Sequence, residues 1–189
     1  MFILYALLAG LIVGALTGGS PTRLGDLRLA WAPLIAVGMG MQVLLFSTPL
    51  GDGLGPAAPI VYVVSNLAVL AAVWRNRLVP GLPLVFVGGA ANLVAICANG
   101  GYMPVSPDAL AALGRGARDG YTNSRPLEGV ILWPLTDLFA MPAWLPMANI
   151  FSIGDVLIGV GAAMAVVAAM HGRGPVARSS RGSVRGEPA

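Results

Sequence analysis

The sequence predicts an all-α integral membrane protein with about five transmembrane helices. Of its 189 residues, 57% are hydrophobic and only 10% are charged. Soluble domains carry about 25% charged residues, so the surface of this protein cannot face water on all sides. The apolar residues also gather into five runs of 16 to 21 residues. About 20 apolar residues in a helix cross the hydrocarbon core of a bilayer, so each run is long enough to span it or nearly so.

The predicted spans are residues 2–17, 29–46, 57–74, 79–98 and 150–170. The first run has no positively charged region before it, and its nearest arginines follow it. We therefore expect a retained helix and not a cleaved signal peptide. The fourth run is the cleanest candidate for a span, and its nine Leu, Ile, Val and Phe residues favour insertion by about 3–5 kcal/mol.

Residues 127–147 are also apolar, but less clearly a span. Asp137 lies at their centre and would cost about 2.5–3.5 kcal/mol in the bilayer. Three prolines would interrupt the hydrogen bonds of a helix here. Because these costs cancel the gain from the apolar residues, we expect an interfacial or re-entrant segment. It belongs to an outer segment, residues 99–149, between the fourth and fifth helices.

The basic residues are distributed unequally between the two sides of the predicted bundle. All eleven are arginines. Five spans place Arg23, Arg28, Arg75, Arg77, Arg173, Arg178, Arg181 and Arg185 on one side, and Arg115, Arg118 and Arg125 on the other. The positive-inside rule then puts the N-terminus outside and the C-terminus in the cytoplasm. Residues 1–171 would form one transmembrane domain, and residues 172–189, rich in Gly, Pro, Ser and Arg, a disordered basic cytoplasmic tail.

The residue inventory excludes several kinds of function. The net charge is +3, but the arginines are scattered singly or in pairs, so we expect no nucleic-acid partner. Cys97 is the only cysteine and His171 the only histidine, which argues against an intrachain disulfide, a metal site and Cys–His catalysis. We expect no cofactor and no metal. The expected partners are the lipid bilayer and either a membrane-protein partner or a second copy of the chain.

Glycines recur every four residues in the first predicted helix, at Gly10, Gly14 and Gly18. Such a stripe of small residues lets two helices approach closely. It fits a homodimer seam or packing within one chain, and we favour packing within the chain.

Polar side chains within the spans are the best candidates for a functional site, because lipid makes their burial costly. Asn66 falls near the midplane, whereas Gln42, Asn92, Asn99 and Asp155 fall in the outer half. With Asp137 from the outer segment, these four predict a polar cluster near the outer face. We expect this cluster to bind a small polar ligand, a lipid headgroup or a partner.

Each member of the cluster also has a purely structural explanation. Asn92 and Gln42 could join helices by hydrogen bonds. Asn99, followed by two glycines, suits the end of a helix, where glycine accepts a left-handed backbone. Ser152 and Asp155 have the spacing of a capping box at the start of a helix.

Other functions remain open. An enzyme would need Asp137 and Asp155 to meet for acid–base chemistry, and no spacing shows that they do, so no residue is assigned a catalytic role. A small transporter or channel subunit would need a polar path past Asn66. A structural or assembly subunit of a membrane complex would use the polar residues only to hold its helices together.

Two motifs carry a family resemblance. Residues 99–105 read Asn-Gly-Gly-Tyr-Met-Pro-Val, and residues 149–158 read Asn-Ile-Phe-Ser-Ile-Gly-Asp-Val-Leu-Ile. With Leu-Gly-Asp-Leu-Arg at 24–28, they resemble a family of small bacterial multi-pass membrane proteins catalogued as a domain of unknown function (number five-three-one-seven). The resemblance implies a protein of the bacterial cytoplasmic (inner) membrane without an assigned activity. Family members often have a histidine between the two motifs, where this chain has Tyr-Thr-Asn at 121–123.

Overall fold

The computed structural model describes residues 2–114 and 122–173, and most of these are helical. The five long helices are α1 (Phe2–Leu16), α2 (Ala32–Ser47), α4 (Ala58–Arg75), α5 (Leu82–Ala98) and α7 (Ile153–Met170). Each begins and ends within three residues of a predicted apolar run, which confirms that the five runs are helices. Arg115, Arg118 and the predicted disordered tail from residue 174 onward lie outside the described residues.

Helix length supports fewer membrane-spanning helices than the five that were expected. By length and composition, two stretches could cross a membrane: Leu50–Arg75, with mean hydropathy 1.9, and α7, with mean hydropathy 2.1. The helices α1, α2 and α5 have 15, 16 and 17 residues. The last two begin three residues later than their apolar runs, because Pro33 and Pro83 favour the first turn of a helix.

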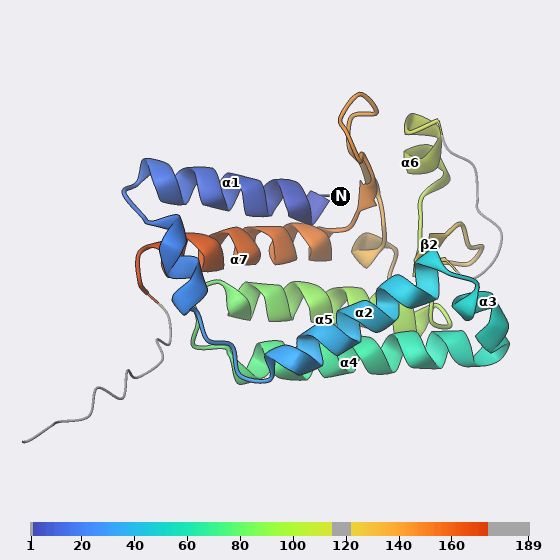
Figure 1. Cartoon of the computed structure of the whole chain (residues 1–189). Coiled ribbons are helices and arrows are strands. Elements are labelled where there is room, and N and C mark those ends of the chain that lie inside the picture. The colour runs from blue at the N-terminus through green and yellow to red at the C-terminus, as the bar shows by residue number, and fades with distance from the viewer. Residues whose placement is uncertain (1, 115–121, 174–189) are drawn as a thin grey trace, which may run out of the picture.

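The long helices lie side by side in the order α1, α7, α5, α4, with α2 packed on α4 (Figure 1). Successive long helices along the chain run in opposite directions, so the first and the last, α1 and α7, lie parallel. One end of the row holds the connections 17–31 and 76–81 and residues 171–173. We call it the arginine end, because it carries Arg23, Arg28, Arg75, Arg77 and Arg173.

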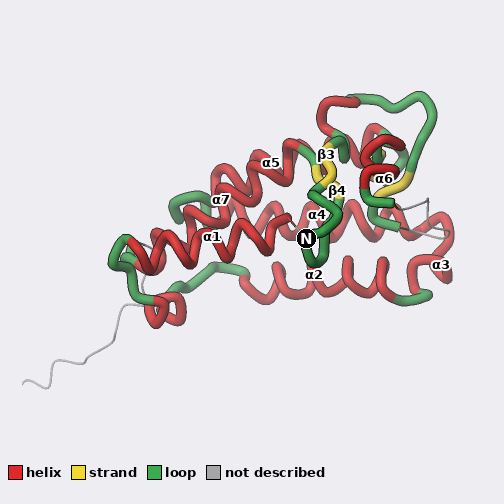
Figure 2. The backbone as a smooth tube through the Cα atoms, turned by 90° about the horizontal axis from the view of Figure 1, so that it is seen from above, coloured by secondary structure: helices red, strands yellow, loops and turns green. Residues whose placement is uncertain are grey.

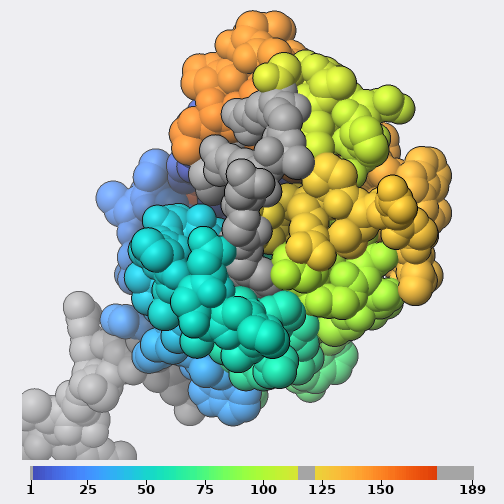
Figure 3. Space-filling view, turned by 90° about the vertical axis from the view of Figure 1, so that its right-hand side faces the viewer, coloured from blue at the N-terminus to red at the C-terminus, as the bar shows by residue number. Residues whose placement is uncertain are grey.

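The opposite end of the row carries a cap, defined here as residues 99–114 and 122–152. In the cap, β1 (Met103–Pro104) pairs in parallel with β2 (Ser124–Arg125), and β3 (Phe139–Ala140) pairs antiparallel with β4 (Ile150–Phe151). The short helix α6 (Pro107–Ala112) follows Ser106 in the cap. Both strand pairs lie over one end of the helices (Figure 2), and the end-on view shows the cap and the α2–α4 connection, where α3 (Leu50–Leu54) lies, on the same face of the molecule (Figure 3).

Residues 127–147 form no α-helix. Their regular structure consists of one 3-10 turn, η3 (Trp133–Leu135), and the strand β3. The turn contacts both α5 and α7, so this segment lies on the ends of these two helices. The other two 3-10 turns, η1 (Pro21–Asp26) and η2 (Gly55–Ala57), lie in the connections before α2 and α4.

Small residues bring the helices close together. A β-carbon added to Gly10 of α1 would stand 2.8 Å from the Cα of Ala163 in α7, and one added to Gly14 would overlap Met170. This confirms packing within the chain for these two glycines, while Gly18 meets nothing within 4 Å. Likewise, a β-carbon on Gly161 would stand 2.5 Å from the carbonyl oxygen of Gly81, where α7 meets the start of α5.

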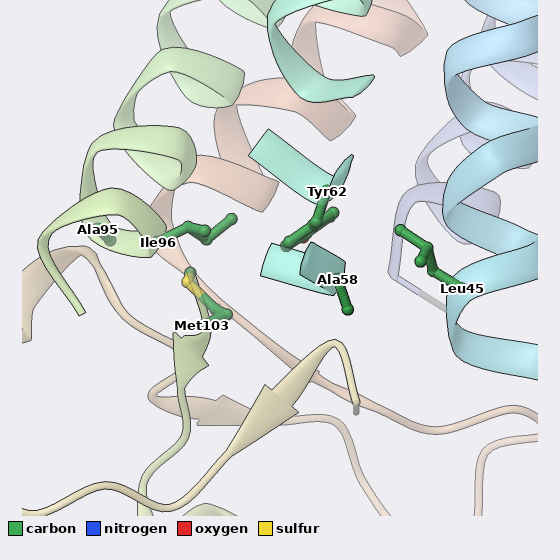
Figure 4. Close-up of a cluster of buried hydrophobic side chains, with 6 residues drawn as sticks. All are labelled: Leu45, Ala58, Tyr62, Ala95, Ile96 and Met103. Atoms are coloured by element: carbon green, nitrogen blue, oxygen red, sulfur yellow. The ribbon is translucent and has the colours of Figure 1, made fainter. Parts of the chain in front are cut away.

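A cluster of buried apolar side chains lies at the cap end, where α2, α4, α5 and β1 meet (Figure 4). Its members are Leu45, Ala58, Tyr62, Ala95, Ile96 and Met103. Tyr62 also reaches the cap, since its hydroxyl donates to Oδ1 of Asn123 at 2.9 Å. Large apolar side chains elsewhere on the long helices remain exposed, among them Leu16 (81%), Val37 (66%), Ile60 (64%), Val94 (51%) and Val160 (47%).

Candidate functional site: a polar cluster beneath the cap

The start of α7 is closed by a reciprocal pair of hydrogen bonds. The backbone N–H of Asp155 donates to Oγ of Ser152 at 3.0 Å, and the N–H of Ser152 donates to Oδ2 of Asp155 at 3.2 Å. This is the capping box that the spacing of the two residues predicts. It satisfies two of the N–H groups that a helix start leaves without intrahelical partners.

Asn92 of α5 completes this arrangement into a ring. Its Nδ2 donates to Oδ1 of Asp155 at 2.8 Å, and Oγ of Ser152 donates to its Oδ1 at 2.8 Å. We call Asn92, Ser152 and Asp155 the polar ring. The close approach depends on Gly154, because a β-carbon there would overlap the Asn92 amide. The helix-joining hydrogen bond that the sequence offered as an alternative for Asn92 is therefore present.

Asp137 lies next to the polar ring, in the cap. Its backbone N–H donates to the carbonyl of Pro104 at 3.0 Å, and its carbonyl accepts from the N–H of Ser106 at 2.9 Å. Its carboxylate accepts from Oγ of Ser124 at 2.5 Å, and the residue is only 5% exposed. Hydrogen bonds thus hold both the backbone N–H and the backbone carbonyl of Asp137, and its carboxylate faces inward.

Burial raises the pKa of Asp137 from its ordinary value near 3.8 to about 7. The hydrogen bond from Ser124 lowers the pKa, while the charge of Asp155 raises it further. The two carboxyl groups are therefore near enough to interact electrostatically. No spacing in the sequence predicted this proximity.

Asn99 occupies a different place. It follows the last residue of α5, and its Nδ2 donates to the carbonyl of Ala95 at 2.8 Å and to that of Ile131 at 2.8 Å. Its Oδ1 accepts from the N–H of Ile131 at 2.9 Å. Asn99 therefore ends the helix, as its alternative explanation predicts, and holds the cap segment around Ile131.

Gln42 is also apart from the polar ring. It lies in α2, which packs on α4 and not on α7, and within the part of the chain that the structure describes its side chain makes no hydrogen bond. Of the five predicted site residues, the structure brings together Asn92 and Asp155, and places Asp137 within electrostatic reach of them. Asn99 and Gln42 are not part of this group.

Three polar residues of the site were not predicted from the sequence. Ser152 was expected only as a helix cap, and Ser124 was not singled out. Arg125 stacks on the ring of Tyr102, with its guanidinium carbon 3.6 Å from the ring centroid. Their partners lie 13 to 60 residues away along the chain, so no local pattern marks them.

The chemistry available to this cluster is hydrogen bonding and proton exchange by two carboxyl groups. Within residues 2–114 and 122–173, no three His, Cys, Asp or Glu side chains gather where they could hold a metal ion. Cys97 lies in the last turn of α5 at the cap end. His171 follows α7 at the arginine end, where its Nε2 lies 3.1 Å from the carbonyl oxygen of Thr17. These two side chains therefore cannot act together.

These features define a mostly helical protein with two candidate membrane-spanning helices and a buried polar cluster beneath a cap. The chain belongs to a family of unknown function, DUF5317, whose sequence profile matches residues 26–167. The match covers α2 to most of α7 and confirms the family resemblance. No curated protein and no solved structure matches the chain.

Proposed function

We propose that this chain is an integral protein of the bacterial cytoplasmic membrane that crosses it five times, with helices α1, α2, α4, α5 and α7. Exposed apolar side chains on all five helices support the proposal, because such surface is costly in water. The five helices carry only two charged residues, Arg75 at the end of α4 and Asp155 in the first turn of α7. Both lie at helix ends, near the level of the headgroups.

The shorter helices fit this proposal with their apolar flanks. A helix of 15 to 17 residues extends about 22–26 Å, against about 30 Å of hydrocarbon. The apolar residues before α2 and α5 supply part of the difference, and modest local thinning of the bilayer supplies the rest.

The arginines give the orientation. Five described arginines lie at the arginine end, and Arg125 lies in the cap. The positive-inside rule therefore puts the arginine end in the cytoplasm, and the N-terminus and the cap outside.

We further propose a non-enzymatic binding role for the cap end, with Asp137 and the polar ring contacting a small polar ligand, a lipid headgroup or a partner. One observation carries this proposal. Asp137 is almost fully buried beside a second carboxyl group, with a raised pKa and without an arginine partner among the described residues. Such an arrangement costs stability and is typical of functional sites. It favours a ligand that donates hydrogen bonds or carries positive charge.

Native mass spectrometry of protein purified from its own membrane tests the binding role. A bound molecule should be retained by the wild type and lost in Asp137→Asn and Asp155→Asn. Asp108→Asn is the matched control, because Asp108 is an exposed carboxylate of the same cap. Equal retention in all four proteins would refute the site.

Cysteine labelling tests the topology. In a Cys97→Ser background, Trp144→Cys places a thiol in the cap and Leu78→Cys places one at the arginine end, at positions that are 79% and 89% exposed. A membrane-impermeant maleimide should label the first in intact cells, and the second only after the cells are opened. The reverse pattern would invert the proposed orientation.

An assembly role is the second candidate. The polar ring uses its hydrogen bonds within the protein, as expected of residues that only join helices. Large apolar side chains are also exposed on the cap, including Trp144 (79%), Trp133 (59%) and Met147 (57%). A stoichiometric partner recovered from native membranes, and lost after Trp144→Ala, would favour this candidate.

The transporter alternative gains no support from Asn66, because its Nδ2 donates to the carbonyl of Tyr62 in its own helix.

A further inference from the structure

A groove of 510 Å³ runs between α1 and α7 toward the arginine end. Its walls are apolar, with Val13 from α1, Val160 and Val167 from α7, and Pro80 from the connection before α5. The volume falls in the range of about 300–1,000 Å³ that is typical of small-molecule sites. Along α7 the wall runs from Val160 to Ala168, which is about 12 Å of helix rise, close to the depth of one leaflet.

Small side chains create the groove. Gly10 meets the backbone of Ala163, which sets α1 close against α7. Beside this contact, Ala9 and Ala168 are too short to fill the space between the two helices. The result is a groove between the two helices that is partly open to their surroundings.

Arg173 lines the end of this groove, and its position is fixed by how α7 ends. Its N–H donates to the carbonyl of Ala168 at 2.8 Å, and the N–H of Gly172 donates to that of Ala169 at 2.9 Å. Gly172 has a φ of +70°, so these bonds form a Schellman motif. This turn brings the chain back across the helix end and holds Arg173 at the mouth.

A second guanidinium lies beside the same turn. Nη1 of Arg23, in η1, would be 3.8 Å from a β-carbon on Gly172. Both arginines are exposed, and within the described residues neither guanidinium group forms a hydrogen bond or an ion pair. The only described acidic residue at this end is Asp26, so the mouth of the groove is predominantly positive.

We propose that the groove holds an acyl chain of one anionic phospholipid, whose phosphate binds Arg173 and Arg23. The apolar walls match the acyl chain, and the unpaired guanidinium groups match a phosphate, which they bind well. The proposal rests on the membrane insertion proposed above, since the lipid would come from the leaflet at the arginine end.

Native mass spectrometry of the full chain in detergent tests this proposal. Phosphatidylglycerol and phosphatidylcholine with identical acyl chains are added in equal amounts, and the retained lipid is counted. An arginine near an anionic headgroup contributes a factor of about five in affinity. Arg23→Gln with Arg173→Gln should therefore lower phosphatidylglycerol retention about 25-fold and leave phosphatidylcholine unchanged.

Two further variants separate the groove from general surface charge. Arg75→Gln removes one charge at the same end, outside the groove, and should leave retention as in the wild type. Ala9→Trp fills the groove from an exposed position and should lower retention of both lipids; Val160→Trp does the same from α7 should the first variant fail to fold.

Wild-type phosphatidylglycerol retention in the double arginine variant, or in a folded groove-filled variant, would overturn the proposal. So would an equal loss in Arg75→Gln. Carbonate extraction of membranes distinguishes a failure of the lipid-site proposal from a failure of the proposed membrane insertion. A chain that resists carbonate but shows no lipid preference refutes the lipid site alone, whereas a chain released by carbonate refutes the membrane insertion itself.

Discussion

Asn76 and Asn99 make matching hydrogen-bond clamps at opposite ends of the helix row. Each follows the last residue of its helix, and each Nδ2 donates to the carbonyl four residues earlier, at 2.7 Å for Asn76 and 2.8 Å for Asn99. Each amide also bonds both backbone groups of one distant residue: Asn76 binds Ala30, and Asn99 binds Ile131. Two helices of the row thus end with the same device, which fixes a remote piece of chain against the helix end.

The Asn99 clamp predicts a local effect in the cap. Asn99→Ala removes all three hydrogen bonds, and because Ile131 is 55% exposed, water can replace them there. We expect faster amide hydrogen exchange at Ile131 and a small change in the free energy of unfolding. Asn76 is 7% exposed, so Asn76→Ala should cost about 1–3 kcal/mol and speed exchange at Ala30 instead. Unchanged protection of Ile131 in Asn99→Ala would contradict this role.

The polar ring predicts a larger effect on stability. Asn92→Ala leaves Oγ of Ser152 and Oδ1 of Asp155 without their partner, and Ser152 is fully buried. We expect a loss of about 1–3 kcal/mol in the free energy of unfolding, measured by denaturation in detergent. The control is Asn66→Ala, because that side chain bonds only within its own helix. Equal losses in both variants would show that the ring adds nothing specific.

The raised pKa of Asp137 predicts a dependence of stability on pH. Between its ordinary pKa near 3.8 and about 7, the folded protein holds one proton more than the unfolded chain. The free energy of unfolding therefore falls as the pH rises through this window and levels off above it. At about 1.4 kcal/mol per pKa unit, the total is at most about 4 kcal/mol.

Asp137→Asn cannot ionise and keeps an acceptor for Ser124. We expect this variant to be more stable than the wild type at pH 8. We also expect its free energy of unfolding to change much less between pH 5 and pH 8 than that of the wild type. Thermal unfolding followed by tryptophan fluorescence measures both. Asp108→Asn should keep the wild-type dependence, and an identical dependence in Asp137→Asn would rule out this carboxyl group as the source.

The contact between α1 and α7 predicts opposite effects for two glycine substitutions. In Gly10→Ala the new β-carbon would meet the backbone of Ala163, so the helices must separate, at a cost of about 1–3 kcal/mol. Gly40 in α2 has nothing within 4 Å, so Gly40→Ala should stabilise its helix by about 0.5–1 kcal/mol. Unfolding of both variants under the same conditions provides the comparison. An unchanged free energy of unfolding in Gly10→Ala would mean that α1 and α7 are not packed closely enough to exclude a β-carbon.

The helices and their ends could be predicted from the sequence because they depend on local features. Apolar runs locate the five long helices, and the spacing of Ser152 and Asp155 predicts the capping box at the start of α7. Three helices, α2, α5 and α7, begin three residues later than their apolar runs. For α2 and α5 the reason is Pro33 and Pro83, which lie in the first turns of these helices. The number of spans could not be read from the runs, since helix length supports only two candidates.

The arrangement of the site could not be predicted, because it depends on which helices become neighbours. Asn92 and Asn99 were both expected in one polar cluster, yet Asn99 lies beyond the end of α5 and its side chain bonds Ile131 instead. The proximity of Asp137 to Asp155 requires the cap to fold back onto α5 and α7. A single sequence contains no periodic signal for such a return.

The position of α7 has a consequence for synthesis. This helix is the last of the five to leave the ribosome, yet it is the one that α1 and α5 both flank. Until residues 153–170 are made, the N-terminal helix has no long helix of its own chain to pack on. Completion of the bundle must therefore wait for nearly the whole polypeptide, and a chain truncated before α7 would leave α1 as an orphan helix open to quality-control proteolysis.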